Sequence, residues 1–272
     1  MIRNLILKCQ SWLTGPTCLS ILVLITAAPA QTFASSLVEN SEIELHVAAA
    51  SDLTHAFNEI TAAFEKTTHQ KVLITYAASG LLEKQIENGA PLDLFASANE
   101  TYLTRLQNLN LLMEPGPQKY AVGHIGIFVS RDQRRAPRRL EDLLDERFTH
   151  VAIANPKVAP YGLAAQQALE KQGIWSRIQP KLVYGENVQQ ALRFVESGNA
   201  DAAIVSASQG QIGSGRFIKI EDTMHQPIIQ ALGIMKSSSN PAGARRFVDF
   251  VLGKEGRQIL KKNGYSEPRN SR

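Results

Sequence analysis

The chain has 272 residues and a formal net charge of +4 at pH 7, from 29 Lys and Arg residues against 25 Asp and Glu residues. Two of the basic groups, Arg3 and Lys8, lie in residues 1–34, which carry no acidic group, so the charge without this segment is +2. That small excess argues against a nucleic-acid-binding protein, and the remaining length suits two lobes of ordinary size.

Residues 1–34 have the pattern of a secretory signal peptide. A positive start is followed by an apolar core and by small-residue cleavage candidates near Ala30 and Ala34. Both cysteines, Cys9 and Cys18, lie inside this segment. We therefore expect an exported mature protein without a thiol, a disulfide or a lipid anchor, whose stability comes from its own core.

The chain after residue 34 alternates short apolar runs with helical periods, a pattern typical of an α/β protein with mainly parallel strands. The first part predicts strands at 43–49, 71–76 and 91–97 and helices at 52–67, 81–88 and 100–109. A later part predicts strands at 150–154, 182–184 and 202–206 and helices at 139–144, 162–172 and 188–197. A final helical region is expected at 242–263.

Two extended runs, 118–130 and 226–235, separate these parts. We interpret them as two crossings between lobes. Lobe 1 then comprises residues 35–121 and 225–272, and lobe 2 comprises residues 122–224. Two crossings imply a two-strand hinge with a cleft between the lobes, and clefts of this kind bind ligands by closing on them.

Four loops stand where a predicted strand runs into a helix, the place where an open α/β sheet presents its ligand. They contain Ser51-Asp52, Ser79-Gly80, residues 159–162 and Asn187-Val188. A single serine in such a loop is more often a helix cap than a ligand group. Four loops divided evenly between two lobes favour binding instead. Because none contains Lys or Arg, they would hold an oxyanion with neutral donors and helix dipoles.

Several motifs make the chain resemble a known family along nearly all of its mature length. They are Val47–Leu53, Ala78-Ser79-Gly80, Gly89–Ala98, Asn155-Pro156, Pro160-Tyr161-Gly162, Glu186-Asn187-Val188, Phe247–Val251 and Asn263-Gly264-Tyr265. In these segments the sequence resembles the periplasmic molybdate-binding proteins of ABC importers.

This resemblance implies the type II periplasmic binding protein fold, with two Rossmann-like lobes joined by a two-strand hinge. It implies a periplasmic, monomeric protein that captures molybdate, and tungstate as well, for an importer permease and ATPase. The anion is the ligand, and no cofactor and no direct metal-cation site are expected. The implied oxyanion-binding residues are Ser51, Asp52, Ser79, Tyr161 and Val188.

Two positions raise questions about this implied site. Asp52 stands where some members of the family have Asn, and its carboxylate would repel a dianion unless it is turned away to cap or pair. Ser206 stands where some members have a Tyr whose hydroxyl joins the ligand shell. Because Ser206 is too short for that reach, Tyr161 could supply the aromatic hydroxyl instead.

Other functions remain as alternatives. The ligand could be another tetrahedral oxyanion, sulfate or phosphate, and the chain could be an extracytoplasmic anion sensor module. An enzyme using Ser51 or Ser79 is disfavoured because no His or Lys lies in the four loops to activate a serine. The six histidines lack metal-ligand spacing. The basic cluster 131–139 lacks aromatic residues and is interpreted as a solvated loop.

Overall fold

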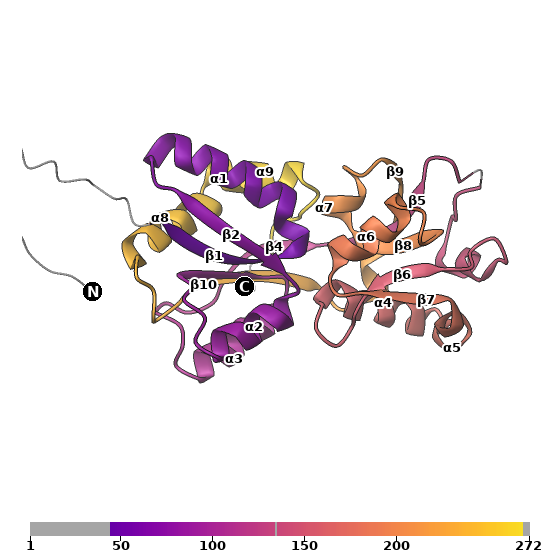
Figure 1. Ribbon diagram of the computed structural model, residues 1–272, viewed down its shortest axis with the longest axis horizontal. Helices are drawn as coiled ribbons and strands as arrows, with labels where there is room; N and C mark the ends of the chain where they lie inside the picture. Colours follow the sequence, from indigo (N-terminus) through magenta and orange to yellow (C-terminus); the bar gives the residue numbers. More distant parts are fainter. Residues whose placement is uncertain (1–43, 134, 269–272) are drawn as a thin grey trace, which may run out of the picture. The chain divides into compact units, whose positions relative to one another are not determined.

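The computed structural model describes residues 44–133 and 135–268. These residues belong to one compact unit, and they form two five-stranded sheets with helices packed on them (Figure 1). The predicted signal peptide, residues 1–34, lies outside the described residues. No helix within the described ranges is long and apolar enough to cross a membrane.

The first sheet has the strand order β2-β1-β3-β10-β4. β1 pairs in parallel with β2 and β3, whereas β10 pairs antiparallel with β3 and β4. The strands are β1 (Leu45–Ala50), β2 (Val72–Ala77), β3 (Leu94–Ser97), β4 (Gln118–Gly123) and β10 (Ile228–Ile234).

Helices cover both faces of the first sheet, with α1 and α9 on one face and α2 and α3 on the other (Figure 1). Phe57, Phe64 and Phe247 pack edge to face beneath α1 and α8, with ring centroids 5.1 and 6.0 Å apart. Each aromatic pair of this kind adds about 0.5–1.5 kcal/mol beyond the burial of its area. The helices are α1 (Thr54–Thr68), α2 (Ser79–Glu87), α3 (Glu100–Asn108), α8 (Pro241–Leu252) and α9 (Lys254–Lys262).

The second sheet has the order β7-β6-β8-β5-β9. β6 pairs in parallel with β7 and β8, whereas β5 pairs antiparallel with β8 and β9. The strands are β5 (Ile125–Ser130), β6 (Val151–Ala154), β7 (Leu182–Gly185), β8 (Ala202–Ser206) and β9 (Gly215–Lys219). The helices are α4 (Pro160–Lys171), α5 (Trp175–Ile178), α6 (Val188–Glu196) and α7 (Ala207–Gly210). α6 buries Val188, Ala191, Leu192 and Val195, the spacing of one helical face, against β6 and β8.

The predicted architecture of two α/β lobes is confirmed, but its details differ in instructive ways. The run 118–130 is not one strand: β4 ends at Gly123 in the first sheet and β5 begins at Ile125 in the second, with His124 between them. Strands are also less uniformly parallel than predicted, because β10 is antiparallel to β3 and β4 in the first sheet and β5 is antiparallel to β8 and β9 in the second. The exact lobe boundaries, 121/122 and 224/225, stay predictions.

Smaller elements also differ from those predicted. Residues Leu140–Leu144 form a 3-10 helix, and the last helical region is two helices separated at Gly253. β9 was not predicted, and it begins at Gly215.

Candidate functional site

All five predicted site residues line one small pocket with a volume of about 10 Å³. The first sheet contributes the turns after β1 and β2, and the second contributes the starts of α4 and α6. No Lys, Arg, Asp or Glu other than Asp52 is among the lining residues, which are Ala50, Ser51, Asp52, Ala77, Ala78, Ser79, Ala98, Ala159, Pro160, Tyr161 and Val188. The pocket can therefore offer hydroxyl and backbone N–H donors.

Ser79 is the first residue of α2 and is fully buried. Its Oγ accepts a hydrogen bond from the backbone N–H of Ala98 at 3.0 Å. Because the Ser79 oxygen accepts this bond, the hydroxyl proton of Ser79 points away from Ala98. The Ser79 side chain also lines the pocket. This arrangement suits a donor to an anion.

Ser51 begins a 3-10 turn, Ser51–Leu53, directly after β1. Neither Ser51 nor Asp52 caps a helix with its side chain, since neither the 3-10 turn nor α1 has a side-chain cap hydrogen bond. The physical reason is that the turn starts at Ser51 itself, so its hydroxyl lies inside the first turn and not before it. The backbone carbonyl of Ser51 instead accepts from Thr54 Oγ1 and Gln209 Nε2.

The Asp52 carboxyl group is buried and paired with neutral donors. Its Oδ2 accepts from Gln230 Nε2 at 2.6 Å, Tyr265 Oη at 2.8 Å and Tyr161 Oη at 2.9 Å. Burial raises the pKa of Asp52, although these three hydrogen bonds act in the opposite direction. The sequence analysis expected this carboxylate to turn away to cap or pair. It does pair, with Tyr161, Gln230 and Tyr265, which are far from it in the sequence.

The hydroxyl of Tyr161 is not available to an anion in this structure. It donates to Asp52 and accepts from Gln230 Nε2 at 2.9 Å, which uses its only proton. The suggestion that this hydroxyl could join the ligand shell in place of Ser206 therefore stays a prediction, and its present partners, Asp52 and Gln230, argue against it. What Tyr161 offers the pocket is its backbone N–H in the first turn of α4, just after Pro160, where helix amides lack intrahelical partners.

Val188 occupies the equivalent position at the first residue of α6. Asn187 caps this helix by accepting from the backbone N–H of Gln190 at 3.0 Å. Val188 lines the pocket, and the N–H groups of a helix's first turn lack intrahelical partners. Helix starts of this kind favour anions through both free amides and the helix dipole.

Ser206 does not line the pocket. Its Oγ lies 3.0 Å from Ser208 Oγ, which donates to the backbone carbonyl of Asp52 at 2.9 Å. Gln230, Tyr265 and Ser208 are thus supporting residues that sequence reasoning missed. Gln230 carried a usable signal, a lone polar side chain within the apolar strand β10.

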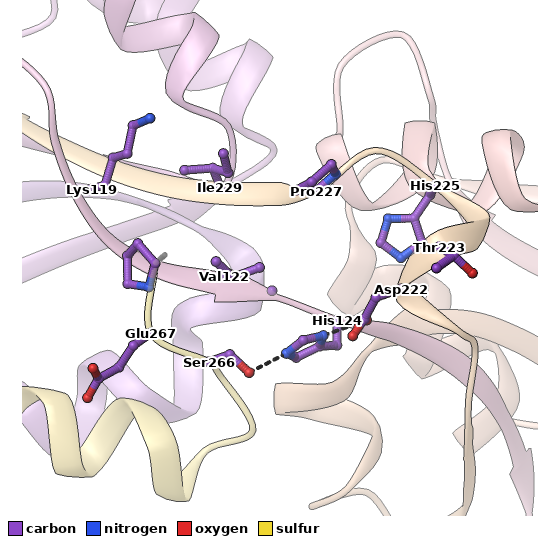
Figure 2. Close-up of a pocket in the computed structure, with 12 residues that line it drawn as sticks. Lys119, Val122, His124, Asp222, Thr223, His225, Pro227, Ile229, Ser266 and Glu267 are labelled. Atoms are coloured by element: carbon purple, nitrogen blue, oxygen red, sulfur yellow. Dashed lines mark hydrogen bonds and ion pairs between the residues drawn. The ribbon is translucent and has the colours of Figure 1, made fainter. Parts of the chain in front are cut away.

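A second pocket, of about 420 Å³, lies where the chain crosses between the sheets (Figure 2). His124 Nδ1 lies 2.6 Å from Asp222 Oδ1, and its Nε2 lies 2.7 Å from Ser266 Oγ. Asp222 and Glu267 line this pocket, and its one lysine, Lys119, is paired with Glu100. This surface is therefore a poor match for a dianion, and the small pocket at the helix starts is the candidate site. Within the described ranges no group of three His, Cys, Asp or Glu residues is placed to hold a metal ion.

Two α/β lobes that contribute helix starts to a shared pocket define the class of ligand-capturing binding proteins. A family model described as bacterial extracellular solute-binding protein matches residues 45–266, and the chain belongs to this family.

Individual relatives agree with this family. The chain is 34% identical over 231 residues to the molybdate-binding protein ModA of Azotobacter vinelandii, covering 82% of this chain and 89% of that protein. It is 33% identical over 227 residues to ModA of Rhodobacter capsulatus, covering 82% and 88%. The solved structure of the Azotobacter vinelandii periplasmic molybdate-binding protein matches with a TM-score of 0.79 and 29% identity over 83% of this chain and 100% of that one. The resemblance found in the sequence is thus confirmed.

Proposed function

We propose that this protein captures molybdate in the pocket between the starts of α2, α4 and α6 and the turn after β1. The observation that carries the proposal is the pocket itself: the five expected residues meet there, and none of the described residues that line it has a cationic side chain. The naming of the 33–34% identical relatives as molybdate-binding proteins supports the same ligand.

In the proposed complex the anion accepts hydrogen bonds from the Ser51 and Ser79 hydroxyls and from backbone N–H groups. The backbone donors are those of Tyr161 and Val188 at the starts of α4 and α6, together with the amides at Ser51, Asp52 and Ser79. Such preorganised neutral donors hold a fully deprotonated oxyanion without ion pairs. Tungstate, with the same charge and shape, is expected to bind as well.

Selection among anions follows from size and protonation. Sulfate has the same charge and shape as molybdate but is smaller, so it would leave the donors too far apart. Hydrogen phosphate carries a proton and needs an acceptor. The Asp52 carboxyl group is the only side-chain acid lining the pocket, and its Oδ2 already accepts three hydrogen bonds.

The wider role follows from the family. We propose that the mature protein is a periplasmic monomer, released from a signal peptide cleaved near Ala30 or Ala34, that delivers the anion to the permease and ATPase of an ABC importer. We expect it to work without a cofactor and without catalysis.

Titration calorimetry of the purified mature protein with molybdate, tungstate, sulfate and phosphate tests the ligand. We expect tight binding of molybdate and tungstate and weaker or no binding of sulfate and phosphate. Tight binding of sulfate or phosphate without a response to molybdate would overturn the assignment.

A further inference from the structure

The Asp52 carboxyl group receives donors from both lobes at one oxygen atom. Tyr161 reaches it from α4, which packs on β6 and β8 of the second sheet. Tyr265 reaches the same Oδ2 from the segment after α9, next to Ser266, which bridges to Val122 of β4 in the first sheet. The two tyrosines thus make nearly equal hydrogen bonds, at 2.9 and 2.8 Å, from opposite sides of the cleft.

A glutamine, Gln230, fixes the positions of the Asp52 carboxyl group and the Tyr161 hydroxyl relative to each other. Gln230, on β10, donates through Nε2 to both Asp52 Oδ2 at 2.6 Å and Tyr161 Oη at 2.9 Å. Its Oε1 accepts from Tyr120 Oη at 2.7 Å, which fixes the orientation of the amide. All of these side chains except Tyr161 belong to elements of the first sheet or pack on it.

The backbone at the crossing makes room for this contact. A Cβ atom at Gly123, the last residue of β4, would lie 2.1 Å from Tyr161 Oη and 3.3 Å from Gln230 Nε2. The backbone of Gly123 does not have a positive φ. A glycine is therefore needed here to leave room for the Tyr161 hydroxyl, and not to adopt a special backbone conformation. Any side chain there would displace the Tyr161 hydroxyl from Asp52.

We propose that the Asp52–Tyr161 hydrogen bond is an interlobe latch, a positioning contact that favours the closed arrangement independently of the anion's own donors. Tyr161 then has two separate roles, a backbone N–H toward the anion and a side chain toward the latch. The latch extends the proposed function, but the contact itself does not depend on which anion is bound.

Two substitutions make a matched test, because each removes one hydroxyl from the same Asp52 oxygen. Tyr161→Phe removes the donor that crosses the cleft, and Tyr265→Phe removes the donor from the same side. Both variants keep the aromatic ring and every backbone N–H. The mature sequence contains no cysteine, so Leu73→Cys on β2 and Tyr184→Cys on β7, both exposed positions, can carry a pair of fluorescent labels.

Single-molecule energy transfer between these labels measures the closed-to-open ratio with and without molybdate. We expect Tyr161→Phe to lower this ratio about 2- to 13-fold, the effect of one ordinary hydrogen bond, and Tyr265→Phe to change it less than about 2-fold. Gly123→Ala should reproduce the effect of Tyr161→Phe while keeping the tyrosine. Far-ultraviolet circular dichroism checks that each variant is folded.

Equal ratios in Tyr161→Phe and in the unmodified protein, or equal losses in the two Tyr→Phe variants, would overturn the latch. A failure of the proposed function is seen separately, as an unmodified protein that does not bind molybdate in calorimetry. The measurement without anion still tests the latch in that case.

Discussion

Apart from the carboxyl group of Asp52, the described residues that surround the candidate anion pocket are neutral, and none is lysine or arginine. The buried hydroxyl of Ser79 shows how one residue is prepared for this role, since its oxygen is occupied by the Ala98 N–H and its proton is left to point away. A dianion placed there gains charge-assisted hydrogen bonds without requiring a buried cation that would be costly when the pocket is empty.

Replacing Ser79 by Ala should therefore weaken molybdate binding. A hydrogen bond to a charged group contributes about 1.5–3 kcal/mol, so we expect a loss of affinity of about 10- to 150-fold in calorimetry. Ser97→Ala is the matched control, because Ser97 is equally buried but its hydroxyl bonds the backbone of Asn99. Equal losses in the two variants would show that the effect of Ser79 is only structural.

The buried Asp52 predicts that binding is linked to protons. Burial raises its pKa above the ordinary value of 3.8, and the neighbouring groups that titrate, Tyr120, Tyr161 and Tyr265, have pKa values raised far out of this range. An acid whose pKa is raised by closure favours the closed state at low pH. The contribution of Asp52 to the stability of the closed state is lost as the pH rises from 3.8 through the raised pKa of this group.

Closure on molybdate should accordingly take up a fraction of a proton in this window. Calorimetry in buffers of different ionisation enthalpy measures this uptake directly. Asp52→Asn, which keeps an acceptor but cannot titrate, should abolish the uptake. Unchanged uptake in Asp52→Asn would assign the proton to another group.

Sequence reasoning found the residues of the pocket but not those that support it. Ser51, Ser79 and Val188 are recognisable because each follows a strand and opens a turn or helix, which is local information. The bonds from Gln230 and Tyr265 to Asp52 span 178 and 213 residues of sequence. No local pattern reports such contacts, and this is why the pairing of the Tyr161 hydroxyl with Asp52 was not predicted.

At the scale of elements, the pocket depends on helices that begin where strands of the two sheets end. α2 approaches the second lobe closely: the backbone N–H of Gly80 donates to the carbonyl of Val158 at 2.9 Å. α4 likewise lies close to β6, and glycine makes this possible: a Cβ atom at Gly162 would lie 2.2 Å from the carbonyl oxygen of Ala154. Small residues at both helix starts allow these approaches.

Gly80→Ala should obstruct closure without weakening its own helix. The added Cβ would lie 2.9 Å from the Val158 carbonyl oxygen, and relief of such overpacking costs about 1–3 kcal/mol, or about 5- to 150-fold in molybdate affinity. Alanine is the better helix former, so the midpoint of thermal unfolding without anion should be unchanged or higher. A lower midpoint together with a weaker affinity would point to general destabilisation instead.

Periodicity predicted most of the long elements because their apolar faces are regular. α6 is the clearest case, with its buried face at helical spacing. The elements that were missed or mistaken are short or irregular: α5 and α7 have four residues each, and β9 is a partly exposed edge strand. The secondary structure of these elements depends on the residues that they pack against, and a local sequence pattern does not show those contacts.

At the scale of the whole molecule, the chain crosses between the sheets near His124 and again between β9 and β10. The sequence indicated both crossings through two extended runs. It could not show that the first run divides at a single residue or that the returning strand β10 lies between β3 and β4. Strand order is decided by pairing between strands that are far apart in the sequence, and a single sequence does not show which strands pair.

The arrangement of crossings explains how the proposed capture of the anion would be coupled to closure of the lobes. Donors on the first sheet and helix starts on the second can meet one anion only when the lobes are together, and the Asp52–Tyr161 contact forms in the same arrangement. Anion binding and the latch therefore bias the same equilibrium, which is the physical basis for capture by closing.

The central claim, that the anion is held by neutral donors at the helix starts, is tested most directly by locating molybdenum. Crystals grown with molybdate and measured at the molybdenum absorption edge give an anomalous peak at the metal's position. We predict a single strong peak between Ser51, Ser79 and the first turns of α4 and α6. A peak at the crossing pocket beside His124, with none at the helix starts, would contradict the account.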